Sequence, residues 1–169
     1  TPLQHGIRKS TIAPTENDTL YRKRIVHGTV HDQVAAMVGG VGGHAGLFSN
    51  ANDLAKELQM LLNGGHYGGK MYLRENTLEL FTSKQNEFCR RGIGWDKLET
   101  HGYGPSSEYC SLHSFGHSGF TGTLVWVDPD YDLIYIFLSN RTFPDSGNNS
   151  LLKNDLRTRI QDVIYETLM

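Results

Sequence analysis

The amino-acid sequence predicts a fold of the α+β class, in which a β-hairpin and several helices follow one another along the chain. Alternation of side chains on both sides of an Asp-Pro turn predicts the hairpin within residues 114–141. Leucines at helical spacing predict one helix after Asn50, and a broad apolar stripe predicts another from Ser150 onward. The chain has 169 residues, of which 38% are hydrophobic, and this length suffices for one domain with a substantial core.

Charge and composition exclude some partners and leave the state of the cysteines open. A net charge of -2 gives no reason to expect nucleic acid or an anionic membrane as a partner. No segment approaches the roughly 20 apolar residues of a membrane span. The chain begins at Thr1 without a signal peptide, as a fragment or a processed product would. Cys89 and Cys110 form neither a zinc motif nor a disulfide framework, so one bridge and two free thiols both remain open.

The predicted hairpin is the centre of the fold. The following residues of its first strand alternate between two faces: Thr121, Gly122, Thr123, Leu124, Val125, Trp126 and Val127. Asp128 and Pro129 suit the first two positions of a turn, because Asp accepts backbone hydrogen bonds and Pro presets φ. The return strand, residues 132–138, is apolar on both faces, which predicts a central strand covered on both sides.

The first 46 residues show little periodicity. Residues 1–40 predict an extended loop with at most one short element, which we expect to pack against another segment, a part of the protein absent from this chain being one candidate. Residues 39–46 hold five glycines among eight residues, which permits positive φ and close backbone approach. This segment lacks the spacing of a phosphate-binding loop, so it is either a flexible connector or a loop that walls a ligand site.

Helices are predicted in three places. The first is capped by Ser49 or Asn50 and ends at Gly64, and its apolar residues are Leu54, Leu58, Met60, Leu61 and Leu62. A second, short helix is predicted over residues 74–82, and residues 83–113 are predicted to be mostly loop with a short strand at 92–95. Ser150 is predicted to cap the last helix, whose stripe comprises Leu151, Leu152, Leu156, Ile160, Val163, Ile164 and Leu168.

Two pairs of histidines four residues apart could indicate a metal-binding site, but the local sequence does not favour one. His27 and His31 form one pair, and His113 and His117 form the other. On a helix this spacing places two imidazoles on one face, but neither segment has a helical composition. In an extended chain the two rings lie roughly 13 Å apart, too far to share one ion. The sequence therefore predicts no metal and no cofactor.

A serine nucleophile can be activated by a lysine one helical turn away, as in the pattern Ser-x-x-Lys. The sequence contains one match, from Ser150 to Lys153. A helix cap explains Ser150 better than catalysis does. No Gly-x-Ser-x-Gly motif occurs, and neither cysteine has the neighbours of a thiol nucleophile.

The triplet His117-Ser118-Gly119, followed by Phe120, can line an acyl-transfer site. The imidazole and the hydroxyl can hydrogen-bond a substrate carboxylate, and glycine lets a substrate lie against the strand. The next backbone N–H can then point at an oxyanion. From spacing alone, a structural histidine at the start of a strand explains the same residues.

Four segments taken together resemble the serine β-lactamase and penicillin-binding-protein superfamily, in its branch of class C-like esterases. In chain order they are Ile12-Ala-Pro-Thr-Glu16; Gly28-Thr-Val-His-Asp32 running on to Gly42-Gly-His-Ala-Gly-Leu-Phe-Ser49; Asn52-Asp-Leu-Ala55 with Met60-Leu-Leu-Asn-Gly-Gly65; and Phe115-Gly-His-Ser-Gly-Phe-Thr-Gly122 with Ser139-Asn140-Arg141. The triplet alone is unspecific, whereas the ordered set of four is specific.

The resemblance implies a mostly antiparallel sheet flanked by helices, together with part of a helical subdomain. It also implies that His117 and Gly119 match the family's Lys-Thr-Gly or His-x-Gly triplet, with Ser118 between them. The N–H of Phe120 is then one of two oxyanion donors. The glycine-rich loop through His44 and Ala45 resembles the loop that faces this strand across the substrate cleft, so we expect His117 and Ser118 to line an open cleft with part of residues 42–46.

The sequence also departs from the family pattern. The family's Ser-x-x-Lys near the start of the domain and its Tyr-x-Asn both precede the segments found here, and none of the eight tyrosines is followed two residues later by Asn. Residues 1–169 therefore resemble the C-terminal portion of such a domain, without nucleophile and without general base. The resemblance further implies an extracytoplasmic location, in the periplasm or the cell envelope.

These observations lead to one hypothesis and one alternative. The hypothesis is that the chain supplies one wall and half of the oxyanion hole of a serine acyl hydrolase that acts on an ester, an amide or a β-lactam. Its expected partners are a small-molecule acyl substrate and either the absent N-terminal part of the domain or a second copy of the chain. The alternative is a non-catalytic binding or structural module that retains the fold.

Overall fold

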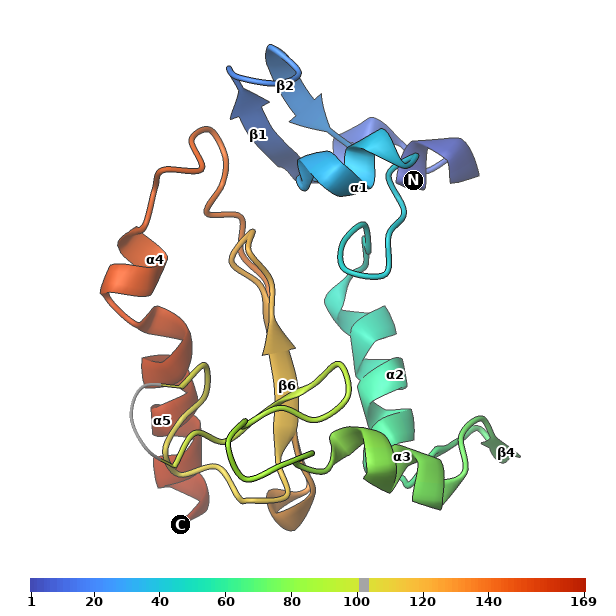
Figure 1. Ribbon diagram of the computed structural model, residues 1–169, viewed down its shortest axis with the longest axis vertical. Coiled ribbons are helices and arrows are strands. Elements are labelled where there is room, and N and C mark those ends of the chain that lie inside the picture. The colour runs from blue at the N-terminus through green and yellow to red at the C-terminus, as the bar shows by residue number, and fades with distance from the viewer. Residues whose placement is uncertain (101–103) are drawn as a thin grey trace. The chain divides into compact units, whose positions relative to one another are not determined.

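The computed structural model describes residues 1–100 and 104–169 and divides them into two compact units (Figure 1). The first unit comprises residues 1–50, 120–122 and 139–154. The second unit lies within residues 51–119, 123–138 and 155–169. Together they contain helices and antiparallel sheets, so the predicted α+β class is confirmed. None of the helices in the described ranges has both the length and the apolar character needed to cross a bilayer.

The first unit contains a hairpin of β1 (Pro14–Asp18) and β2 (Arg24–His27), so the prediction of an extended loop over residues 1–40 is wrong. The turn between the strands forms because the Asp18 carboxylate accepts hydrogen bonds from the backbone N–H groups of residues 20, 21 and 22. The remaining elements of this unit are η1 (Pro2–His5), η2 (Lys9–Thr11), α1 (Gln33–Met37) and α4 (Ser150–Lys153).

Residues from both ends of the chain meet along β1. The Thr142 hydroxyl donates to the carbonyl of Thr15 at 2.8 Å, and the backbone N–H of Asn17 donates to the carbonyl of Pro144 at 3.0 Å. The Asn140 amide also donates to the carbonyl of Pro14. The expectation that this N-terminal region packs against another part of the protein is therefore met by residues 140–144.

The second unit is built on a four-stranded antiparallel sheet of order β5-β6-β7-β8. Its strands are β5 (Asp96–Lys97), β6 (Phe115–Ser118), β7 (Leu124–Asp128) and β8 (Leu133–Phe137), and η3 (Pro129–Tyr131) joins the last two. The helices are α2 (Ala51–Leu62), α3 (Glu75–Thr82) and α5 (Leu156–Leu168), and a small ribbon pairs β3 (His66–Tyr67) with β4 (Lys70–Met71).

Each face of this sheet has its own hydrophobic core, with α5 and α2 on opposite sides (Figure 1). The cluster that includes α5 contains Cys110, Leu124, Trp126, Tyr135 and Tyr165. The cluster that includes α2 contains Leu58, Leu61, Phe115 and Val127. Two covered faces explain why β7 and β8 are apolar on both sides.

The predicted hairpin is present, with two corrections. Its first strand begins at Leu124 and not at Thr121, because Gly119 N–H donates to the carbonyl of Thr123 at 2.8 Å and closes a turn before it. Its return strand, β8, is covered on both faces as expected, but it forms the edge of the described sheet and is not central.

Helix predictions succeeded where the apolar repeat was strong. The helices α2 and α3 match their predicted ranges. The strand expected at residues 92–95 is instead a turn, closed by a hydrogen bond from Gly92 N–H to the carbonyl of Trp95, and β5 begins one residue later. Most of residues 83–113 is loop as predicted, and residues 101–103 of this range lie outside the described part.

The last predicted helix is two helices, because the chain turns at Asp155, which has a positive φ of 50°. Ser150, which was predicted to cap the helix, is instead the first residue of α4, and Asn149 is the N-cap residue. The face of α5 that is buried carries Gln161 and Tyr165, and the side-chain oxygen of Gln161 accepts a hydrogen bond from Ser107 N–H at 3.0 Å. Much of the predicted apolar stripe is therefore exposed.

Two of these features predict that the isolated chain associates with itself. Along α5 the exposed fractions are 40% for Leu156, 43% for Ile160 and 58% for Val163, which form one apolar row. In addition, β8 presents an edge without a partner strand in the described sheet. Exposed apolar rows and open strand edges recruit partners. We expect light scattering at micromolar concentration to show dimers or larger species; a monomer with fully protected β7 and β8 amides would contradict this.

Candidate functional site

The triplet lies at the end of β6, which pairs His117 with Val125 and Ser118 with Leu124 on β7. The prediction placed the triplet at the start of the next strand, so its position in the sheet is corrected. Along β6 the chain passes from buried to exposed, since Phe115 and Gly116 are buried and His117 is exposed. Gly116 is required here, because a Cβ at this position would meet the ring of Trp126 on the neighbouring strand.

The hydrogen bonds of His117 define its tautomer. Its Nε2 lies 3.0 Å from Nη1 of Arg91, and its Nδ1 lies 2.8 Å from the carbonyl oxygen of Ser118. A guanidinium can only donate, so Nε2 must accept, and Nδ1 must carry the proton that it donates to Ser118. The contacts therefore fit a neutral imidazole whose acceptor nitrogen faces a fixed cation.

Arg91 is itself tied to a buried carboxylate. Its Nε lies 2.8 Å from Oδ1 of Asp96, whose side chain is only 3% exposed, while the Arg91 side chain is 47% exposed. Arg90 approaches the same oxygen at 3.3 Å and reaches Glu99 at 3.7 Å. A line of three groups thus runs from Asp96 through Arg91 to His117, and the Arg91 side chain in its centre is about half exposed.

Sequence reasoning missed Arg91 and Asp96. Arg91 lies 26 positions before His117, and no motif joins them. The contact depends on β5 pairing with β6, which sets Asp96 opposite Gly116, one residue before His117. The one signal in the sequence was the Arg90-Arg91 doublet at the beginning of a segment with strand character.

Other titratable groups of the second unit have structural roles. The Lys97 ammonium donates to the carbonyl of His113 at 3.0 Å, and burial lowers the pKa of Lys97 to about 8. The buried Asp128 carboxylate accepts a hydrogen bond from the Tyr165 hydroxyl at 2.6 Å. Cys89 and Cys110 are free thiols, and burial raises the pKa of Cys110 to about 11, which disfavours the nucleophilic thiolate.

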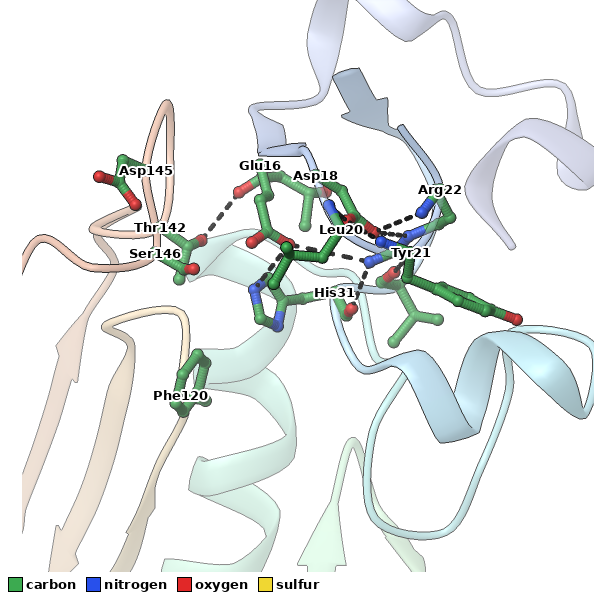
Figure 2. A network of polar contacts seen from close by, with 12 residues as sticks. Glu16, Asp18, Leu20, Tyr21, Arg22, His31, Phe120, Thr142, Asp145 and Ser146 are labelled. Carbon is green, nitrogen blue, oxygen red and sulfur yellow. Dashed lines mark hydrogen bonds and ion pairs between the residues drawn. The ribbon is translucent and has the colours of Figure 1, made fainter. Parts of the chain in front are cut away.

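Phe120 follows the triplet directly and belongs to the first unit. The Arg141 guanidinium carbon lies 4.4 Å from the centroid of the Phe120 ring, and the His31 ring centroid lies 5.1 Å from it. Figure 2 shows His31 between Phe120 and Glu16, whose carboxylate is 3.0 Å from Nε2 of His31. The backbone N–H of Phe120 donates to no atom of the described residues.

The glycine-rich loop forms a closed turn within the first unit. Gly42 N–H donates to the carbonyl of Ala45 at 2.9 Å, and Nε2 of His44 lies 3.0 Å from Oδ1 of Asp32. Asp32 also caps α1 through a hydrogen bond from Ala35 N–H, and these contacts lower the pKa of Asp32. His44 and Ala45 belong to one unit and His117 and Ser118 to the other, so the shared cleft stays a prediction.

Ser150 and Lys153 both lie on the short helix α4 and are exposed. The described residues show no hydrogen bond between the Ser150 hydroxyl and the Lys153 amine, which a serine–lysine pair would need. The histidine pairs 27/31 and 113/117 lie in strands and loops and not in helices, as expected.

Similarity to known proteins extends over most of the chain. The family model described as "Beta-lactamase" matches residues 1–158. A protein of Escherichia coli (strain K12) named "Putative D-alanyl-D-alanine carboxypeptidase" is 36% identical over 152 residues, which are 83% of this chain and 35% of that protein. A protein of the same name from Salmonella gallinarum is 34% identical over 165 residues, which are 90% of this chain and 38% of that protein.

A solved structure shows the same fold. The crystal structure of a beta-lactamase from Mycobacterium bovis superposes with a TM-score of 0.56 at 24% identity, covering 73% of this chain and 46% of that chain. The chain thus spans little more than a third of the length of these curated relatives and about half of that beta-lactamase.

Proposed function

Because the chain belongs to the beta-lactamase family, we propose that residues 1–169 form the C-terminal portion of a serine acyl-hydrolase domain. In this proposal the chain supplies the strand that binds the substrate and one oxyanion donor, and it does not supply the nucleophile. The observation that carries the proposal is the cluster at the end of β6, where Arg91 is held against His117 by the buried Asp96. This cluster offers an acyl substrate a fixed cation beside a strand end.

The proposed reaction is hydrolysis of an ester, an amide or a β-lactam. A serine outside this chain attacks the carbonyl carbon, and its hydroxyl proton passes through a base to the leaving group. The N–H of Phe120 donates to the oxyanion that develops on the carbonyl oxygen. Water then hydrolyses the acyl-enzyme ester. Gly119 lets the substrate lie along the strand.

The name of the curated relatives supports the proposal that the substrate carries a carboxylate group. A D-alanyl-D-alanine carboxypeptidase acts on a peptide with a free terminal carboxylate, and the charge at the end of β6 suits such a group. The half-exposed Arg91 side chain can bind a carboxylate in the charge-assisted manner typical of arginine, and the Ser118 hydroxyl can donate to the same carboxylate.

A serine-reactive label tests the proposal on the longer protein that contains this chain. We expect a fluorophosphonate or a labelled penicillin to attach covalently to one serine outside residues 1–169, at a rate that a carboxylate-bearing substrate slows by competition. Absence of labelling in the folded protein would refute the hydrolase and favour the alternative of a binding module that retains the fold.

Arginine substitutions test the carboxylate site on the chain itself. We expect Arg91→Gln to weaken binding of N-acetyl-D-alanine at least tenfold, because the guanidinium is lost, a change of about 1.4 kcal/mol in binding free energy. Amide shifts of His117 and Gly119 in an NMR titration report the binding. Arg90→Gln is the matched control, since Arg90 contacts Asp96 and Glu99 and not His117. Equal effects of both variants would contradict the assignment.

A further inference from the structure

We propose that Arg141 is a positioning residue that fixes the backbone of residues 120–122, and with it the N–H of Phe120. This inference rests on the proposed function, in which that N–H faces an oxyanion. Arg141 belongs to the Ser139-Asn140-Arg141 segment, which sequence analysis used only as part of a resemblance. The first unit contains every residue on which the argument depends.

Three successive carbonyl groups after the triplet are each held by a residue of 139–141. Arg141 Nε donates to the carbonyl of Phe120 at 2.8 Å, and Arg141 backbone N–H donates to that of Thr121 at 3.0 Å. The Ser139 hydroxyl donates to the carbonyl of Gly122 at 2.8 Å. These hydrogen bonds hold the three peptide planes that follow the Cα of Phe120. The N–H of Phe120 lies in the preceding plane, so the anchored carbonyl and ring set the position of its nitrogen through the shared Cα.

The side chain of Phe120 is held as well as its backbone. The Arg141 guanidinium stacks at 4.4 Å from the ring centroid, within the range of a cation–π contact. The neighbouring His31 is fixed in turn, because Glu16 lies 3.0 Å from its Nε2 and Arg22 donates to its carbonyl at 2.7 Å (Figure 2). Although Phe120 is 65% exposed, its ring therefore contacts two planar groups, the Arg141 guanidinium and the His31 imidazole.

Arg141 is itself immobilised. It is 8% exposed, and its Nη1 donates to the carbonyls of Ser146 at 3.0 Å and Asn148 at 3.1 Å. One planar group thus bridges the loop at residues 146–148 and Phe120. Lysine cannot replace it, because a single ammonium on a flexible stem cannot stack on a ring while donating from two separate nitrogens.

The consequence for catalysis is preorganisation. An oxyanion donor lowers the barrier most when its direction is set before charge develops, since no free energy is then spent on reorienting it. The N–H of Phe120 donates to no atom of the described residues, whereas the carbonyl and the ring of the same residue are both anchored to Arg141. Arg141 acts through Phe120 and does not touch the substrate.

Backbone order parameters from ¹⁵N relaxation of the chain test this inference. In the native chain we expect values of about 0.85 for the amides of residues 120–122, as in a rigid backbone, and in Arg141→Lys values below about 0.6. Phe120→Leu keeps the carbonyl contacts and loses the stacked ring, so we expect a smaller decrease in that variant. Val26→Ala is the control, because it removes volume from the buried side of β2 without touching Phe120.

The outcomes separate positioning from general stability. A loss of order confined to residues 120–122 in Arg141→Lys, with Val26→Ala unchanged there, supports the inference. Unchanged order in Arg141→Lys or Phe120→Leu, or an equal loss in the control, overturns it. The order parameters are measured without substrate, so they do not depend on the proposed function. If a longer protein that contains this chain had no acyl-hydrolase activity, the proposed function would be refuted, but the measured effect of Arg141 on residues 120–122 would still hold. In an active protein, we expect Arg141→Lys to lower kcat more than it raises KM.

Discussion

The 169-residue chain, purified alone, is expected to hydrolyse neither a chromogenic β-lactam nor a p-nitrophenyl ester above the buffer rate. The proposed reaction needs a serine paired with a base, and loss of the nucleophile removes covalent catalysis. In a serine protease, removing the nucleophile costs on the order of 10⁶-fold in kcat. A deficit of this size places any residual rate below detection in a spectrophotometric assay at micromolar protein.

Ser150→Ala is the control for this expectation, because Ser150 and Lys153 are the one Ser-x-x-Lys match in the sequence. Turnover by the native chain that disappears in Ser150→Ala would identify Ser150 as a nucleophile and contradict the proposal. Turnover that survives the substitution would point to a contaminating hydrolase, which a serine-reactive label on a gel distinguishes by mass.

In a longer protein that supplies the nucleophile, as proposed, His117→Ala is expected to lower kcat/KM by about 10²-fold, the size of effect seen when one oxyanion-site donor is removed. The substitution deletes the acceptor that holds Nη1 of Arg91 at 3.0 Å, so the guanidinium keeps its contact with Asp96 but loses the one that holds it beside the strand end. Steady-state kinetics on one ester and one β-lactam measure the effect.

His113→Ala is the matched control for that experiment. His113 lies four residues earlier, its side chain is 76% exposed, and its contact at 3.0 Å is with Asp130 and not with Arg91. We expect this variant to stay within about threefold of the native kcat/KM, as a surface substitution away from the site should. If His117→Ala also stayed within that range and folded normally, His117 would be a structural residue.

Residue spacing along the chain correctly predicted those helices and strands whose formation depends mainly on neighbouring residues. The helix α2 follows from leucines at helical spacing, and the pairing of β7 with β8 follows from alternation on both sides of the Pro129 turn. The same reasoning could not find β1, whose sequence Pro-Thr-Glu-Asn-Asp contains residues that are depleted in strands. This strand is held by hydrogen bonds to residues 140–144, which no local pattern encodes.

The orientation of α5 shows a second limit. Apolar side chains at helical spacing predicted which face would be buried, yet the buried positions are Gln161 and Tyr165. Gln161 is buried because Ser107 and Cys110 lie opposite it and supply partners for its amide, at 3.0 Å and 3.3 Å. A polar side chain with two partners can replace an apolar one in a core, and only the folded chain brings those partners together.

The candidate site also contains residues that the sequence predicted and residues that only the folded structure revealed. Motif order pointed to His117, Ser118, Gly119 and Phe120, and these residues follow one another along the chain. Arg91 and Asp96 could not be inferred, because their contact with His117 exists only when β5 pairs with β6. Arg141 was part of a matched segment, but its role depends on Phe120, which lies 21 positions away.

The first unit imposes an order of events on biosynthesis. Thr15 and its partner Thr142 are 127 positions apart, so β1 cannot acquire its partners at residues 140–144 until most of these 169 residues have been made. At about 5–20 residues per second, the ribosome needs roughly 6 to 25 seconds to make that stretch. Throughout this time Pro14, Thr15 and Asn17 lack their hydrogen-bonding partners at residues 140–144. The β1–β2 hairpin can form early, but its hydrogen bonds with residues 140–144 are completed only late in translation.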